Sequence, residues 1–337
     1  MSLNDNFKRL NSNESPYNIP SQILDKVLSE MPEFLFNTYP DQYSDDFRAS
    51  LSNITKKNND QIICTNGSDE LIKVIIDTFA KPGDMILSHA PTFVEYRVMS
   101  EIRGCNYFEI APNKDMSCDM ESLLAKVKSC DSGILFLCSP NNPTGEVFLN
   151  DQIELFLKGF KGLVVVDEAY SEFADSSAMS LIDKYPNLLI MRTLSKAYGL
   201  ASIRVGYGVA NKNIIDKLNA KKMPYNLNKL SALIATIAMD NVHLFDEAIN
   251  TIKKERNRMF EELSTISGLN FFRGESNFIL VKTSVAELIV NKLLSKDIKT
   301  RLFQENLLSD GYFRFSISSP KVNDIVINTI KEIIYEN

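Results

Sequence analysis

Three runs of continuously apolar residues constrain the fold of this chain more than any other feature. They are Ile134–Leu137, Leu163–Val166 and Leu188–Met191. A strand that is covered on both faces of a parallel sheet has this uninterrupted apolar composition. Each run ends in polar residues, and open α/β sheets place their ligand sites at the carboxyl ends of the strands. The sequence therefore predicts an α/β fold whose functional residues follow these runs.

Composition narrows the function classes. The chain has 337 residues, of which 44% are hydrophobic and 24% charged, as in an ordinary globular protein with one large or two medium domains. A formal net charge of -6 disfavours a nucleic-acid partner. No apolar run reaches the length of a membrane span and no signal peptide is visible, so we expect no membrane partner and a cytoplasmic location. Five scattered cysteines and two histidines predict neither a disulfide framework nor a metal site.

The loop after the third run carries an unusual set of polar groups. Thr193 and Ser195 offer hydroxyls, and Lys196 and Arg204 offer cations, all within a few residues of a buried strand. Such a loop can bind a phosphate group and leave one amine in the same cavity. Taken alone, the stretch is equally compatible with a solvated surface lysine.

Four segments, read together, resemble the fold-type-I, pyridoxal-phosphate-dependent aminotransferases, and within them the histidinol-phosphate aminotransferase branch is closest. The segments occur in the order typical of that family and extend the resemblance over nearly the whole chain. They are Gly67–Glu70, Ser139–Gly145 (S-P-N-N-P-T-G), Asp167–Tyr170 (D-E-A-Y) and Thr193–Arg204. An acidic pair at Asp167 could instead hold Mg²⁺, but no Walker-type phosphate loop accompanies it.

The resemblance implies a large domain with a mostly parallel seven-stranded sheet flanked by helices, plus a smaller α+β domain. We expect an N-terminal arm and helix at 1–35 that pack with the small domain, a large cofactor-binding domain at 36–220 and the small domain at 221–337. Within this frame, the apolar spacing of Ile23, Leu24, Val27 and Leu28 predicts an amphipathic helix that starts at Ser21. The segment Gly206–Gly208 is expected on an antiparallel edge strand.

The resemblance also implies residue roles around pyridoxal 5′-phosphate. Lys196 carries the cofactor and moves the proton, while Asp167 faces the pyridine nitrogen, because a buried carboxylate favours the protonated ring. Asn142 and Tyr170 bond the phenolic oxygen, and Phe93 stacks on the ring. The phosphate contacts are Ser68, Asp69, Thr193, Ser195 and Arg204. The alternatives are an ordinary helix cap at Ser68 or Asp69 and core packing for Phe93.

Substrate and partner contacts follow from the same resemblance. Arg314, on a strand between aromatic residues, binds the substrate carboxylate through a two-pronged ion pair, and Arg301 and Asn13 line the same pocket. An arginine on such a strand is otherwise exposed. Tyr39, before a proline, reaches the site of a partner subunit and implies a homodimer; its alternative is a plain loop.

The implied activity is that of a transaminase of histidine biosynthesis, which moves the amino group of histidinol phosphate to 2-oxoglutarate by a ping-pong scheme. The chain differs from the pattern of that branch in three ways, so other activities remain possible: little chain precedes Leu10, Phe93 replaces a tyrosine, and Ala201–Ile203 replaces A-G-L. The rivals are a phosphothreonine or phosphoserine decarboxylase and an aminotransferase for another small phosphorylated substrate. A non-catalytic cofactor-binding regulator would carry a DNA-binding segment, for which the sequence gives no sign.

Overall fold

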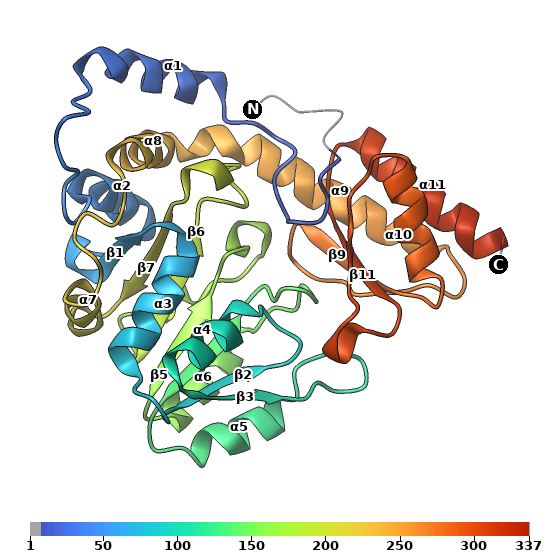
Figure 1. Ribbon diagram of the computed structural model, residues 1–337, viewed down its shortest axis with the longest axis horizontal. Coiled ribbons are helices and arrows are strands. Elements are labelled where there is room, and N and C mark those ends of the chain that lie inside the picture. The colour runs from blue at the N-terminus through green and yellow to red at the C-terminus, as the bar shows by residue number, and fades with distance from the viewer. Residues whose placement is uncertain (1–7, 337) are drawn as a thin grey trace.

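The computed structural model describes residues 8–336 and contains two sheets of different size (Figure 1). The larger sheet has seven strands in the order β1-β7-β6-β5-β4-β2-β3. Its strands are β1 Ile62–Thr65, β2 Met85–His89, β3 Asn106–Ile110, β4 Ile134–Cys138, β5 Leu163–Asp167, β6 Leu188–Thr193 and β7 Gly206–Ala210. The pairs from β3 to β6 are parallel, and β7 is antiparallel to both of its neighbours. The predicted seven-stranded, mostly parallel sheet is confirmed.

The position of β7 corrects one expectation. Gly206–Gly208 do lie on an antiparallel strand, but β1 pairs with that strand and occupies the edge. Gly208 faces the apolar side chains Leu71 and Ile63, so the strand is covered on this side as well. Which strand lies at the edge of a sheet depends on pairing between distant segments. The glycine pattern within one segment does not determine that pairing.

Helices cover both faces of the large sheet, which explains the continuously apolar strands (Figure 1). Alternate residues of β4 belong to different core clusters: Ile134 and Phe136 to one, Leu135 and Leu137 to the other. The first cluster includes residues of α3 (Gly67–Phe79), α4 (Glu95–Arg103) and α7 (Lys212–Asn219). The second includes residues of α2 (Asp45–Thr55), α5 (Met120–Lys128) and α6 (Asn150–Gly159).

The smaller sheet is antiparallel, in the order β10-β11-β9-β8. Its strands are β8 Asn270–Phe271, β9 Phe278–Lys282, β10 Arg301–Leu302 and β11 Tyr312–Ser316. Helices α10 (Ala286–Ser295) and α11 (Pro320–Glu336) pack against each other on this part of the molecule, and α11 also contacts α9 (Asp246–Ser264). No helix within residues 8–336 has both the length and the apolar character needed to cross a membrane.

The N-terminal segment links the two parts of the chain. Leu10 forms backbone hydrogen bonds with Lys299 (2.7 Å) and Ser316 (2.9 Å), which extends the small sheet. Helix α1 (Ser21–Glu30) then packs against α8 (Lys229–Asp240), and α8 also contacts α2. The domain bounds 1–35, 36–220 and 221–337 stay a prediction.

Helix α1 begins at Ser21 as expected, but no side chain caps it. Ser21 is the first residue of the helix, and Pro20 is the N-cap residue. The carbonyl of Pro20 accepts hydrogen bonds from the backbone of Ile23 and Leu24. Proline is well suited to the start of a helix because the first positions need no backbone donor.

Candidate active site

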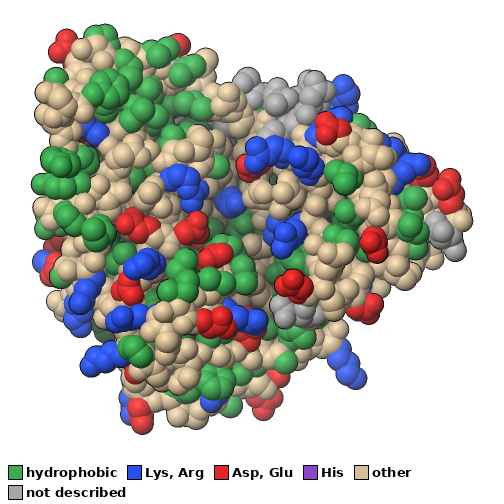
Figure 2. Space-filling model, in the orientation of Figure 1, with side chains coloured by type: hydrophobic (Ala, Val, Ile, Leu, Met, Phe, Trp, Pro, Cys, Tyr) green, Lys and Arg blue, Asp and Glu red, His purple; other side chains and the backbone are tan. Residues whose placement is uncertain are grey.

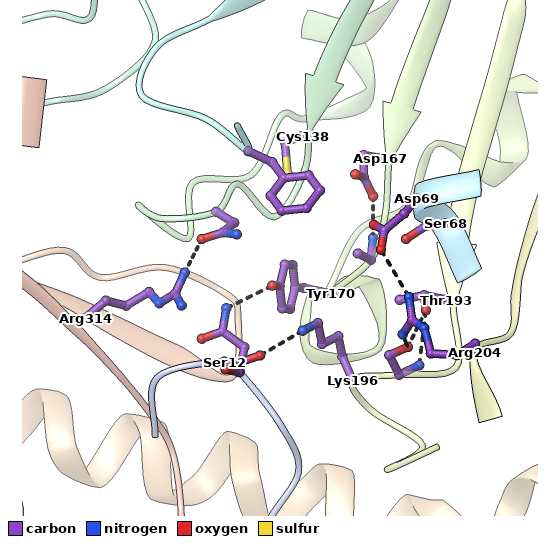
Figure 3. A pocket seen from close by; sticks show the side chains of 15 residues that line it. Ser12, Ser68, Asp69, Cys138, Asp167, Tyr170, Thr193, Lys196, Arg204 and Arg314 are labelled. Carbon is purple, nitrogen blue, oxygen red and sulfur yellow. Dashed lines mark hydrogen bonds and ion pairs between the residues drawn. The ribbon is translucent and has the colours of Figure 1, made fainter. Parts of the chain in front are cut away.

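A cavity of about 270 Å³ lies at the carboxyl ends of β4, β5 and β6, where the loops that follow these strands meet the arm and the small sheet (Figure 3). Every predicted site residue except Tyr39 and Arg301 lines this cavity. Ser12, Cys138 and Ala169 line it as well, and none of the three was predicted as a site residue. The three apolar strands run in the same direction, so their carboxyl ends lie at one edge of the sheet. As predicted, they bring together side chains that are far apart in the chain.

One end of the cavity is rich in hydroxyls and cationic groups. Thr193 Oγ1 donates to Ser195 Oγ at 3.0 Å, and Arg204 Nη1 approaches the same oxygen at 3.4 Å. Arg204 Nη2 donates to Asp69 Oδ2 at 3.1 Å (Figure 3). The first turn of α3 also borders this end, since Ser68 lines the cavity, and backbone N–H groups at a helix start favour anions.

Close packing of β7 against α3 shapes this end further. A Cβ atom on Gly206 would lie 2.5 Å from the backbone nitrogen of Ser68, so only glycine fits there. The helix has Asn66 as its N-cap residue, and no side chain of Ser68 or Asp69 acts as the cap. The alternative interpretation of these two residues as ordinary caps is therefore wrong.

Another part of the cavity carries a buried carboxylate. Asp167, the last residue of β5, is 3% exposed. Its Oδ1 accepts the backbone N–H of Ala169 at 3.1 Å, and its Oδ2 accepts the hydroxyl of Tyr96 at 2.6 Å. Burial raises the pKa of Asp167 to about 6, while these two hydrogen bonds act in the opposite direction. Sequence reasoning missed Tyr96; its position three residues after Phe93 gave only a weak signal.

A half-buried lysine lines the same cavity. Lys196 Nζ donates to the backbone carbonyl of Ser12 at 2.9 Å (Figure 3). Burial lowers the pKa of Lys196 to about 8, and the cations Arg314 and Arg204 lower it further against the opposing charges of Asp69 and Glu14. Roughly a tenth of such a lysine is a neutral amine at pH 7. The amine can therefore act as a nucleophile and as a proton carrier.

The small sheet contributes an arginine to the same cavity. Arg314 is 7% exposed, so the alternative of a surface arginine is excluded. Its guanidinium donates to Asn142 Oδ1 and to the carbonyl of Asn11, and Nε has no hydrogen-bond partner within residues 8–336. Burial lowers the pKa of Arg314 to about 10, which still leaves a cation at neutral pH. A buried cation with an unpaired donor suits an anionic ligand group.

The arm residue Asn13 is also buried in this region. Its Nδ2 donates to the Tyr170 hydroxyl at 2.9 Å, and its backbone N–H donates to Ser316 Oγ at 3.0 Å. Asn13 has a φ of 56°, a left-handed conformation that asparagine adopts more easily than most residues. The arm therefore holds Tyr170 as well as Lys196 in place.

Two predicted site residues lie outside the cavity. Tyr39 is 79% exposed, and its ring stacks on Tyr225 with the centroids 4.8 Å apart. Arg301 is exposed and lies over the ring of Phe303, although it pairs with Arg314 in the β10–β11 register. Phe93 does line the cavity, with its ring edge-on to Tyr96.

Comparison with known proteins identifies the family. The family model described as aminotransferase class I and II matches residues 6–330. The histidinol-phosphate aminotransferase of Thermoanaerobacter pseudethanolicus is 36% identical over 326 residues, which cover 97% of this chain and 93% of that protein. The chain belongs to the class I and II aminotransferases. The predicted family and enzyme class are thereby confirmed.

Solved structures of this family have the same fold. The histidinol-phosphate aminotransferase of Clostridium acetobutylicum superposes with a TM-score of 0.89 at 28% identity, covering 98% of this chain and 99% of that one. The enzyme of the same description from Sinorhizobium meliloti, solved in complex with pyridoxal-5′-phosphate, has a TM-score of 0.88 at 24% identity, with 97% and 90% covered. The predicted fold type is confirmed.

The donor set of the cavity fits the cofactor of class I and II aminotransferases, pyridoxal phosphate. A phosphate needs cations, hydroxyls and amides, and one end of the cavity offers Arg204, Ser195, Thr193 and the start of α3. A pyridine nitrogen needs a proton and a counter-charge, and another part of the cavity offers Asp167. Lys196 lines the same cavity as both.

Proposed function

We propose that this chain catalyses the transfer of the amino group of L-histidinol phosphate to 2-oxoglutarate in a ping-pong reaction. The observation that carries the proposal is the single cavity that holds a lysine of lowered pKa, a buried carboxylate and a buried arginine. Curated relatives named histidinol-phosphate aminotransferase support the substrate, at 36% identity over 97% of the chain. The support for the phosphothreonine decarboxylase alternative is a similarity of fold to the L-threonine-O-3-phosphate decarboxylase of Porphyromonas gingivalis, at 22% identity.

The residues assigned to the cofactor follow the two chemically different parts of the cavity. Asp167 faces the ring nitrogen, Asn142 and Tyr170 bind the phenolic oxygen, and Phe93 covers the ring. The phosphate group is held by the following residues: Ser68, Asp69, Thr193, Ser195 and Arg204. When bound, pyridoxal phosphate supplies an electron-withdrawing ring that stabilises negative charge at the substrate α-carbon.

Lys196 performs the proton transfer in this proposal. With the cofactor bound, Lys196 Nζ would hold it in the resting protein, and as a free amine it would carry the proton from the substrate α-carbon to the aldehyde-derived carbon of the cofactor. The lowered pKa suits this role, because a general base works best when its pKa lies near the working pH. Arg314 binds the anionic group of each substrate in turn, with further contacts from Asn13 in the cavity and from Arg301 on the neighbouring strand β10.

The assembly is a homodimer in this proposal, with Tyr39 reaching the site of the partner subunit. Tyr39 is highly exposed and does not touch the cavity of its own chain. Hydrophobic side chains gather around α1 and the segment that follows it (Figure 2). They include Leu24, Leu28, Leu35 and Phe36, which are 49–76% exposed. An exposed apolar patch of this kind is typical of an interaction surface.

The proposed location is the cytoplasm, in keeping with five free cysteine thiols.

A single-turnover experiment tests the function directly. The cofactor-loaded protein is mixed with L-histidinol phosphate in the absence of any 2-oxo acid, and the cofactor absorbance is followed. The expected result is loss of the visible band with formation of the amine form of the cofactor, which 2-oxoglutarate then reverses.

An unchanged spectrum with histidinol phosphate would contradict the proposed substrate while leaving the family assignment intact. Release of CO₂ from O-phosphothreonine would then support the decarboxylase alternative. The matched control is the Lys196→Ala variant, which should show no turnover with either compound.

A further inference from the structure

A tyrosine that does not line the cavity is coupled directly to its carboxylate. Tyr96, on α4, is fully buried, and its hydroxyl donates to Asp167 Oδ2 at 2.6 Å. Its ring stacks on Phe136 of β4, with the centroids 4.6 Å apart and the planes 7° from parallel. Phe93 meets the same ring edge-on at 5.7 Å. Tyr96 therefore contacts both the acidic end of the cavity and the aromatic residue of its wall.

We propose that Tyr96 is a positioning residue that holds the Asp167 carboxylate ionised and in a fixed orientation at the ring-nitrogen end of the cofactor site. The proposal deepens the proposed function and rests on its cofactor assignment. It gives a role in the reaction to a residue outside the cavity lining.

The geometry leaves Asp167 little freedom to rotate. One carboxylate oxygen accepts the backbone N–H of Ala169, and the other accepts the Tyr96 hydroxyl. A carboxylate held through both oxygens keeps one orientation, and each oxygen retains a lone pair for a further donor. The stacking on Phe136 fixes the tyrosine ring in turn, so the hydroxyl is delivered from a rigid position.

The groups around Asp167 determine how much the Tyr96 hydroxyl contributes to keeping the Asp167 carboxylate ionised. Asp69 on α3 and the neighbouring Glu168 both raise the pKa of Asp167, and burial raises it more than either. From β4, the thiol of Cys138 faces the same region, and burial raises the pKa of Cys138 beyond that of an ordinary thiol. The cations Lys196 and Arg204 line the same cavity from the loop after β6.

Against that background, Tyr96 and the Ala169 amide supply the hydrogen bonds that favour the ionised carboxylate. Loss of the Tyr96 hydroxyl should therefore raise the pKa of Asp167 above its value of about 6. The carboxyl would then be substantially protonated close to neutral pH, where it no longer offers a counter-charge. Below the pKa of Asp167 the cofactor should bind weakly, and above it the binding should reach a plateau.

The test measures the dissociation constant of pyridoxal phosphate between pH 5 and 9 for the wild type, Tyr96→Phe and Tyr107→Phe. Tyr107 is the matched control: it packs against the same core cluster, but its hydroxyl donates to Glu109 at 3.2 Å, and it does not line the cavity. We expect Tyr96→Phe to weaken binding on the order of tenfold near pH 6.5, the loss expected for a hydrogen bond to a charged group. The pH range in which cofactor affinity falls should be higher for Tyr96→Phe than for the wild type. The pH profile of Tyr107→Phe should match that of the wild type.

An additivity test separates positioning from a general loss of structure. If Tyr96 acts through Asp167, Tyr96→Phe should have almost no further effect on cofactor affinity in an Asp167→Asn background. Equal losses in both backgrounds, or a wild-type pH profile for Tyr96→Phe, would overturn the proposal. A wild type that binds no pyridoxal phosphate at any pH would instead contradict the proposed function. Failure with histidinol phosphate would leave these binding results unchanged.

Discussion

Among single residues, Lys196 gives the most direct pH prediction. Its neutral amine is the form that reacts with the aldehyde of the cofactor, and its pKa of about 8 lies below the ordinary lysine value of 10.5. The rate of cofactor capture by the cofactor-free protein should therefore rise with pH, pass its midpoint near pH 8 and level off above it. Stopped-flow absorbance measures this rate. A midpoint near 10.5 would mean that the pocket does not lower the pKa of the lysine.

Arg314 gives a second prediction at this scale. Replacement by glutamine removes a buried cation whose Nε has no partner in the described part of the chain, so the anionic group of the substrate loses its charge-assisted hydrogen bonds. The apparent KM for the 2-oxo acid in the second half-reaction should rise on the order of 100-fold, with a smaller change in kcat. Steady-state kinetics at saturating amino donor measures both.

Arg301 supplies the control for Arg314, because the two residues face each other in the β10–β11 register while Arg301 is exposed. Arg301→Gln should raise KM less than Arg314→Gln does. Equal effects of the two substitutions would contradict the assignment of Arg314 as the principal anion contact.

The site residues differ in how far sequence reveals them. Asp167 ends an apolar strand, and Lys196 and Asn142 lie within a few residues of the ends of two others, so the parallel direction of these strands suffices to bring them to one edge. Tyr96 and Ser12 were missed, because their contacts join separate elements. Nothing near Tyr96 in the chain indicates that Asp167, 71 positions later, will accept its hydroxyl.

At the scale of elements, the contact between β7 and α3 determines the phosphate end of the cavity. A Cβ atom at Gly206 would lie 2.5 Å from the nitrogen of Ser68 and 2.6 Å from the carbonyl carbon of Gly67, both backbone atoms. Gly206→Ala must therefore push the start of α3 away from the strand. We expect a loss of about 1–3 kcal/mol in the free energy of unfolding, and weaker cofactor binding. Urea denaturation and cofactor titration measure these two effects.

Gly159, the last residue of α6, is the matched control for Gly206. A Cβ atom there would make only contacts of 3.4 Å or longer with flexible side chains, and its φ is not in the left-handed region. Gly159→Ala should leave cofactor affinity unchanged and keep or slightly increase stability, because alanine favours helix. Unaltered cofactor binding in Gly206→Ala would contradict a role for this packing in the site.

The elements themselves were largely predictable, whereas their pairing was not. The continuous apolar runs became β4, β5 and β6, buried on both faces. The edge position expected for Gly206–Gly208 belongs to β1, which precedes β7 by well over 100 residues. Local residue patterns encode the period and burial of a strand, but the choice of neighbour depends on the packing of the complete sheet.

Across the whole molecule, the arm and the small sheet complete a site that the large sheet only begins. Leu10 pairs with the small sheet, the Ser12 carbonyl accepts the Lys196 amine, and Asn13 donates to the Tyr170 hydroxyl. Arg314 adds a cation from β11 and also bonds the carbonyl of Asn11. Segments from both ends of the chain therefore meet at the lysine, so the substrate pocket depends on the relative position of all three parts.

The proposed dimer extends this dependence to a second chain and gives a prediction for the assembled molecule. Tyr39→Ala and Lys196→Ala subunits should each form nearly inactive homodimers, because each lacks one residue of every site. If Tyr39 acts across the interface, a mixed dimer combines the Lys196 of one subunit with the Tyr39 of the other. One of its two sites is then intact, so activity should reappear after the two variants are unfolded and refolded together.

The control pair is Arg314→Gln with Lys196→Ala, since both residues line the cavity of the same chain. No mixed dimer of these variants contains an intact site, and co-refolding should restore nothing. In an equal mixture of Tyr39→Ala and Lys196→Ala subunits, about half of the dimers are mixed and each mixed dimer has one working site. The activity recovered in a transaminase assay should therefore approach about one quarter of the wild-type rate. Absence of recovery with the first pair, in dimers verified by analytical ultracentrifugation, would mean that Tyr39 does not serve the partner's site.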